Sequence, residues 1–153
     1  MRKILVLLLV LSICSCLLSC MNRFENQTPN NEEITKMYIT INDNKLAVTL
    51  EENSTVDALI ELLKKEDIIF TATDYGNFEK VGSIGYTLPT NNSQITTEAG
   101  DVVLYSGNQI VLFYGSNSWS YTLLGKIEGY MVEELRLLLG AGNGSVEVRI
   151  SLT

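Results

Sequence analysis

Few residue types in this chain could carry chemistry, and their distribution excludes several mechanisms. There is no histidine, and all three cysteines, Cys14, Cys16 and Cys20, lie within the first 20 residues. Nucleophiles that depend on histidine, and zinc sites built from cysteine and histidine, are therefore excluded. The aspartates are scattered without the spacing of a calcium-binding loop. We expect neither a metal nor a cofactor.

One carboxylate pair and two lysines could still take part in catalysis. Asp74 with Glu79 could act as acid and base, and Lys80 or Lys126 could supply a positive charge. The simpler interpretation is a solvated loop that carries both carboxylates, with both lysines at the surface. We favour that interpretation, so no catalytic residue is predicted.

Aromatic side chains are the remaining candidates for a site. We predict a ligand-binding groove formed by Tyr75, Phe78, Gln109, Tyr114, Asn117 and Trp119, in which the two amides supply hydrogen bonds. The alternative is that the aromatic residues simply pack in the core. Strand alternation places Phe113 and Tyr114 on opposite faces, so at least one of them should face outward.

The charge balance limits the partners. The chain has 11 basic and 18 acidic residues, a net charge of −7. Cleavage before Cys20 would remove Arg2 and Lys3, leaving nine basic against 18 acidic side chains, or −9. Such a surface repels phosphate backbones and anionic lipid headgroups. We therefore expect no nucleic-acid partner, and any membrane attachment must come from lipid.

The N-terminus has the features of a lipoprotein signal peptide over residues 1–19. A basic start at Arg2 and Lys3 precedes an apolar run at residues 4–18, which is short for a membrane span. The run ends in Leu-Leu-Ser-Cys, which resembles the bacterial lipobox, so Cys20 is the predicted lipidation site. A plain secretory signal or a membrane anchor with an incidental cysteine is the alternative.

The residues after the predicted cleavage point form a tether rather than a domain. Residues 20–35 are mostly polar, are interrupted by Pro29 and show no apolar period. Acyl chains on Cys20 would hold the protein on the cell membrane or the outer membrane, facing away from the cytoplasm.

Residues 36–153 are predicted to form one mainly β domain, a compact barrel with two helices. Helices are expected at residues 55–65 and around 131–139, the first begun by a capping box at residues 54–57 and ended by Lys64 and Lys65. Strands are expected at residues 37–41, 46–50, 68–73, 86–88, 101–105, 109–114, 119–127 and 146–152. Residues 74–82 are expected to be an ordered loop, and residues 90–100 a polar connection.

Three segments, residues 74–82, 96–105 and 107–127, resemble the small bacterial cyclophilin-like domain family. Their most distinctive run is Phe-Tyr-Gly-Ser-Asn-Ser-Trp-Ser-Tyr, at residues 113–121. The resemblance extends over residues 37–152 and implies a cyclophilin-type β-barrel with helices over its open ends.

The same resemblance does not carry an activity with it. True cyclophilins use an arginine in a Phe-His-Arg motif, whereas Arg136 and Arg149, the arginines of the predicted domain, lie in no matching motif. We therefore predict a monomeric, non-catalytic module that binds a peptide or a small ligand. The alternative is a peptidyl-prolyl isomerase that lacks the usual catalytic arginine.

Overall fold

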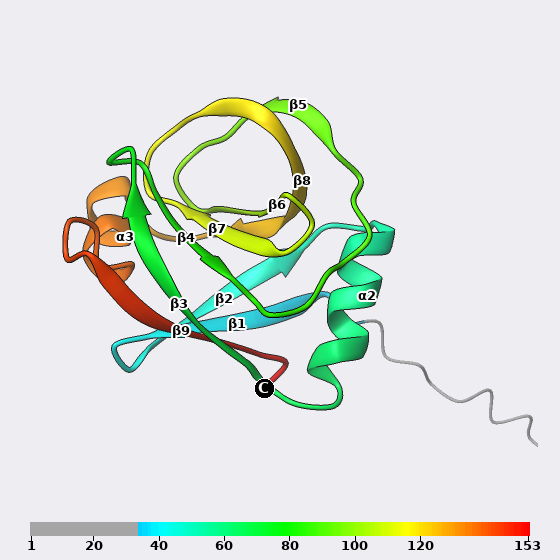
Figure 1. Ribbon diagram of the computed structural model, residues 1–153. Coiled ribbons are helices and arrows are strands. Elements are labelled where there is room, and N and C mark those ends of the chain that lie inside the picture. The colour runs from blue at the N-terminus through cyan, green and yellow to red at the C-terminus, as the bar shows by residue number, and fades with distance from the viewer. Residues whose placement is uncertain (1–33) are drawn as a thin grey trace, which may run out of the picture. The chain divides into compact units, whose positions relative to one another are not determined.

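The computed structural model describes residues 34–153, which contain nine strands and two helices (Figure 1). The strands are β1 (Lys36–Ile41), β2 (Asn44–Leu50), β3 (Ile68–Tyr75), β4 (Glu79–Ser83), β5 (Ser93–Thr96), β6 (Asp101–Tyr105), β7 (Gln109–Phe113), β8 (Ser118–Ile127) and β9 (Ser145–Ser151). The helices are α2 (Ser54–Leu63) and α3 (Val132–Leu138). The predicted signal peptide, the lipidation site at Cys20 and most of the tether lie outside the described residues.

Eight of the strands close into an antiparallel barrel, which confirms the predicted fold class. The strand order is β2-β1-β9-β3-β4-β7-β6-β8, and β8 returns to pair with β2. The ninth strand, β5, pairs only with the first half of β8. Figure 1 shows β5 and the start of β8 arching away from the rest of the barrel. Closure leaves few free strand edges, which would otherwise invite aggregation.

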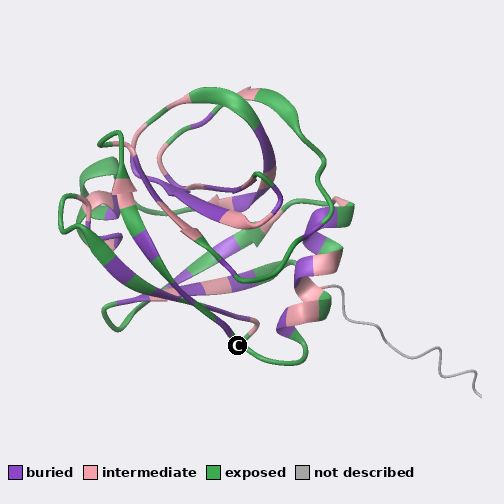
Figure 2. Cartoon of the chain, viewed as in Figure 1, coloured by how far each residue is buried: buried purple, intermediate pink, exposed green. Residues whose placement is uncertain are grey.

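The barrel interior is the hydrophobic core, and strand alternation fills it. In β1, Met37, Ile39 and Ile41 are at most 1% exposed, while the residues between them face outward. Buried residues of both helices, such as Leu59 and Leu135, join the same cluster. Figure 2 shows the buried stripes along the strands and on the inner sides of the helices. Each such aliphatic side chain contributes about 1.5–3 kcal/mol through burial.

The first helix begins one residue earlier than the predicted capping box. Asn53 is the N-cap, and its side-chain oxygen accepts hydrogen bonds from the backbone N–H groups of Thr55 and Val56. Its amide also donates to the Leu123 carbonyl of β8, at 2.9 Å. The prediction at Ser54 was wrong because this contact, which ties the helix to the barrel, favours asparagine. At the other end Lys64 is the C-cap, so no basic residue lies in the last turn.

Three connections also differ from the predictions. Residues 74–82 are a tight hairpin between β3 and β4, because Gly76 and Asn77 adopt positive φ angles of 60° and 61°. Residues 86–88 form no strand; the Leu88 N–H bonds the Gly107 carbonyl in a loop. The polar stretch at residues 90–100 contains β5. Because most of its side chains are exposed, it lacks the alternation of buried and exposed residues by which a strand is recognised. The other predicted strands are present, with ends within two residues.

Residues 34–153 contain no helix with the length and hydropathy needed to cross a bilayer.

Candidate functional site

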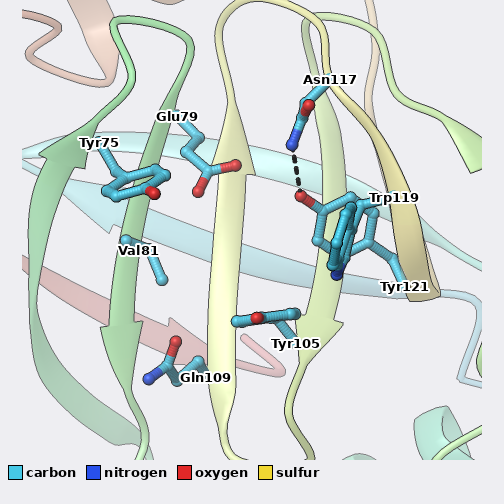
Figure 3. Close-up of a pocket in the computed structure, with 8 residues that line it drawn as sticks. All are labelled: Tyr75, Glu79, Val81, Tyr105, Gln109, Asn117, Trp119 and Tyr121. Carbon is cyan, nitrogen blue, oxygen red and sulfur yellow. Dashed lines mark hydrogen bonds between the residues drawn. The ribbon is translucent and has the colours of Figure 1, made fainter.

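A pocket of about 380 Å³ opens on the outer face of the barrel. Its walls come from β3, β4, β6, β7 and β8, and it is lined by Tyr75, Glu79, Val81, Tyr105, Gln109, Asn117, Trp119 and Tyr121. In Figure 3, Tyr75 and Glu79 project from one side while Asn117, Trp119 and Tyr121 project from the other, across β7. The arch made by β8 and β5 therefore turns a barrel surface into a hollow.

Neighbouring residues of β4 face opposite sides of the barrel wall. Glu79 and Val81 point outward into the pocket, whereas Lys80 points into the interior. Glu79 is only 6% exposed, and its buried Oε2 atom has no hydrogen-bond partner among residues 34–153. Burial raises the pKa of Glu79 to about 7, because a charged carboxylate loses hydration there. The prediction that Glu79 lies on a solvated loop was wrong.

Packed aromatic rings form the floor beside Glu79. Tyr75 meets Phe78 edge to face, with centroids 6.2 Å apart, and Phe78 stacks on Phe113 at 6.3 Å. Phe113 meets Tyr121 at 5.6 Å, and Tyr121 meets Tyr105 at 5.9 Å, both edge to face. These are favourable arrangements for aromatic pairs. The series connects three lining rings, those of Tyr75, Tyr105 and Tyr121, through Phe78 and Phe113 beneath the pocket.

Asn117 holds the far wall in position. Its side-chain nitrogen donates to the Tyr121 hydroxyl at 2.9 Å, the dashed line in Figure 3. Its backbone carbonyl accepts from both the N–H and the hydroxyl of Thr97, so the start of β8 is tied to the segment after β5. Burial raises the pKa of Tyr121, and the charge of Glu79 adds to this rise although the Asn117 hydrogen bond opposes it. Glu79 and Tyr121 therefore influence each other electrostatically.

Four of the six residues predicted to bind a ligand line this pocket: Tyr75, Gln109, Asn117 and Trp119. Phe78 lies beneath it as part of the aromatic floor. Tyr114 lies in the barrel interior, 1% exposed, with its hydroxyl donating to Asp74. Phe113 and Tyr114 do face opposite sides, but neither is exposed, because the β8–β5 arch covers the outer side.

Four lining residues were not among the predicted ligand-binding residues, namely Glu79, Val81, Tyr105 and Tyr121. Three of them carried a readable signal. Glu79 and Val81 are two residues apart, as are Asn117, Trp119 and Tyr121 in turn. This is the spacing of side chains on one face of a strand. Treating residues 74–82 as a hairpin would have placed Glu79 on the same face as Val81.

Inside the barrel, behind Glu79, lies a buried ion pair. Lys80 is fully buried, and its Nζ lies 2.8 Å from Asp74 Oδ1 and 2.7 Å from the Gly144 carbonyl oxygen. Asp74 also accepts hydrogen bonds from the Tyr114 hydroxyl and the Gly144 N–H, each at 2.9 Å. The prediction of a surface position for Lys80 was therefore wrong, whereas Lys126 is partly exposed and pairs with Glu98 and Asp101.

The pKa of Asp74 reflects this environment. Burial by itself would raise it, but the hydrogen bonds from Lys80, Tyr114 and the backbone outweigh burial and lower it below its usual value. The barrel wall thus separates Asp74 from Glu79, and the pKa values of the two carboxyl groups are shifted in opposite directions. They do not form an acid and base pair around one substrate.

The arginines of the described region serve other contacts. Arg136 lies over the Tyr114 ring, 5.0 Å from its centroid, and Arg149 pairs with Asp67 at 3.1 Å. Neither lines the pocket. Within residues 34–153, no group of three or more acidic, histidine or cysteine side chains is placed to hold a metal ion.

Comparison with known proteins identifies the fold. The family described as "Cyclophilin-like family" matches residues 39–151. A hypothetical protein from Archaeoglobus fulgidus, solved in solution, superposes with a TM-score of 0.57 at 18% identity, covering 78% of this chain and 95% of that one. McbB, solved in complex with tryptophan, superposes with a TM-score of 0.53 at 18% identity, covering 75% of this chain but 44% of McbB. No curated protein matches.

Proposed function

The chain belongs to the cyclophilin-like family, and we propose that it is a cell-envelope protein, anchored by lipid on Cys20, whose barrel binds a peptide or a small molecule without catalysis. The observation that carries the binding role is the pocket itself. It combines connected aromatic rings with a buried carboxylate whose Oε2 has no partner among the described residues. Concave, mostly apolar hollows with a few polar groups are typical ligand sites.

If the pocket lining served packing alone, it would lower the stability of the fold. A buried carboxylate without a hydrogen bond destabilises a fold, and the described residues that line the pocket with Glu79 include no cation to offset this. Two large aromatic residues at the rim, Tyr75 and Trp119, are 64% and 56% exposed, so they contribute little to the core. Exposed aromatics around an unsatisfied polar group favour a binding site over packing.

Prolyl isomerisation gains no support from this site. Among residues 34–153, those that line the pocket include neither arginine nor lysine. An isomerase must favour the twisted amide over the planar one against a barrier of about 18–20 kcal/mol. An unpartnered negative charge beside the substrate carbonyl would oppose that stabilisation.

Trp119→Ala should weaken ligand binding by about tenfold or more, because an aromatic wall would be lost from the pocket rim. Protein-observed NMR with a fragment and peptide library would find the ligands and measure their affinities. Since Trp119 is 56% exposed, the variant should keep the thermal midpoint of the parent. Tyr130→Ala, at a partly exposed aromatic outside the lining, is the matched control and should bind normally.

This binding role fails if no library member shifts the resonances of the lining residues. It also fails if Tyr130→Ala and Trp119→Ala weaken binding equally, because the ligand would then lie elsewhere.

Cys20→Ser should release the protein from the membrane fraction, because the thioether that carries diacylglycerol can no longer form. Cys16→Ser should leave attachment unchanged, since the lipobox pattern ends at Cys20. Fractionation of cells and intact-mass measurement would check both variants. A native chain found unmodified and still beginning at Met1 would contradict the anchoring and the envelope location together.

A further inference from the structure

Among the described residues, Glu79 is the one acidic side chain in the pocket lining. It is more than nine-tenths buried, its Oε2 has no partner, and Figure 3 shows its carboxylate directed toward the space between Tyr75 and the far wall. An apolar ligand would leave this oxygen unsatisfied. An anionic ligand would place a second negative charge beside it. Only a hydrogen-bond donor, and best a positively charged one, satisfies it.

The surroundings of Glu79 supply no such charge. The titratable groups that share the pocket lining with it from β3, β6 and β8 are the phenols of Tyr75, Tyr105 and Tyr121, and its register partner on β7 is Phe113. Behind the wall, Lys80 is held by Asp74 and the Gly144 carbonyl. Above a pH of about 7 the pocket therefore presents, among aromatic rings, a negative charge that no described residue of the lining compensates.

Aromatic rings themselves favour a cation. The faces of tyrosine and tryptophan rings are electron-rich and attract ammonium groups within about 6 Å. Four such rings, those of Tyr75, Tyr105, Trp119 and Tyr121, line the same pocket as the carboxylate. The lining thus combines the two features that recognise an amine, a carboxylate acceptor and an aromatic enclosure.

We propose that the pocket binds ligands through a protonated primary or secondary amine, whose N–H donates to Glu79 while an apolar body lies against Tyr75 and Trp119. This deepens the ligand-binding role proposed above and rests on it. It names a ligand class, amphipathic amines, which includes lysine side chains and free amino termini of peptides. An acidic or a purely apolar ligand is a poorer fit.

The proposal makes the affinity depend on pH in a defined direction. Because burial raises the pKa of Glu79 to about 7, the carboxylate is mostly protonated at pH 5 and mostly charged at pH 8. An aliphatic amine stays protonated over that range. Its affinity should therefore rise from pH 5 to pH 8, whereas the affinity of a neutral analogue should not.

Three matched probes test the inference by calorimetric or NMR titration of the domain at pH 8: 2-phenylethylamine, 2-phenylethanol and 3-phenylpropionate. We expect the amine to bind about tenfold or more tightly than the alcohol, and the acid to bind most weakly. Glu79→Gln, which keeps the side-chain shape, should bring the amine down to the affinity of the alcohol. Glu147→Gln, at an exposed position on β9, should preserve the preference for the amine.

The outcomes distinguish a failure of the amine inference from a failure of the ligand-binding role. Equal binding of the three probes by the parent overturns the amine inference and leaves a ligand-binding pocket. Absence of binding by all three overturns the amine inference, and absence of any ligand in the wider library overturns the binding role as well. The pH series needs no variant, and an amine affinity that is flat between pH 5 and pH 8 also overturns the inference.

Discussion

Asp74→Ala is expected to lower the free energy of unfolding by about 3–5 kcal/mol, because it leaves a buried charge without its partner. Lys80 is fully buried, and its ammonium would keep only the Gly144 carbonyl, 2.7 Å away. The Tyr114 hydroxyl and the Gly144 N–H would each lose an acceptor as well. Urea denaturation followed by circular dichroism would measure the loss.

An exposed ion pair provides the matched control for this prediction. Asp67 and Arg149 form an ion pair at 3.1 Å, and both side chains are more than a third exposed. Asp67→Ala breaks this pair and should lower the free energy of unfolding by less than about 1 kcal/mol. Combining Asp74→Ala with Lys80→Met should cost less than the sum of the two single changes, because no charge is then stranded. A loss in Asp74→Ala no larger than that in Asp67→Ala would show that the buried pair does not stabilise the barrel.

The same pair should make the domain sensitive to acid. The folded pKa of Asp74 lies below its usual value of 3.8, so the unfolded chain binds the proton more readily. Its contribution is therefore complete above the unfolded pKa and is lost as the pH falls through the folded one. Asp74→Ala should lack this part of the acid dependence.

Much of the fold was predictable because the barrel depends on short-range alternation. Met37, Ile39 and Ile41 alternate within a strand, and the interior needs nothing more specific than apolar residues at such positions. The strand β5 was not predictable on this basis. Three of its four residues are exposed, and the strand is formed by its antiparallel backbone pairing with residues 118–121 of β8. Pairing between distant segments determined β5, whereas local alternation was enough to predict most of the other strands.

The site was only partly predictable for a related reason. Tyr75, Asn117 and Trp119 lie near strand ends, where aromatic and amide residues are conspicuous in a sequence. Glu79 and Lys80 are adjacent charged residues, and in isolation such a pair is typical of a solvated loop. The structure instead places the barrel wall between them. Lys80 is neutralised by Asp74 inside the barrel, whereas Glu79 has no partner among the described residues on the outer side. Their opposite roles follow from a tertiary position that no local pattern indicates.

Glu79→Gln should stabilise the domain by about 2–3 kcal/mol at pH 8 and leave its stability unchanged at pH 4. The folded pKa of about 7 lies above the usual 4.5, so between these values the folded state holds a proton that the unfolded state has released. Stability of the parent therefore falls as the pH rises from about 4.5 to about 7 and then stays level. The amide carries no charge and escapes this loss.

Denaturant titrations of both proteins from pH 4 to pH 8 would measure the difference, with Glu147→Gln as the exposed control that should follow the parent. A stability difference between parent and Glu79→Gln that does not change with pH would contradict the raised pKa. If Glu79→Gln gains stability while losing amine binding, the carboxylate costs the fold free energy at the position where it serves recognition. A natural site that gives up stability in this way is expected where function, rather than packing, determines the residue.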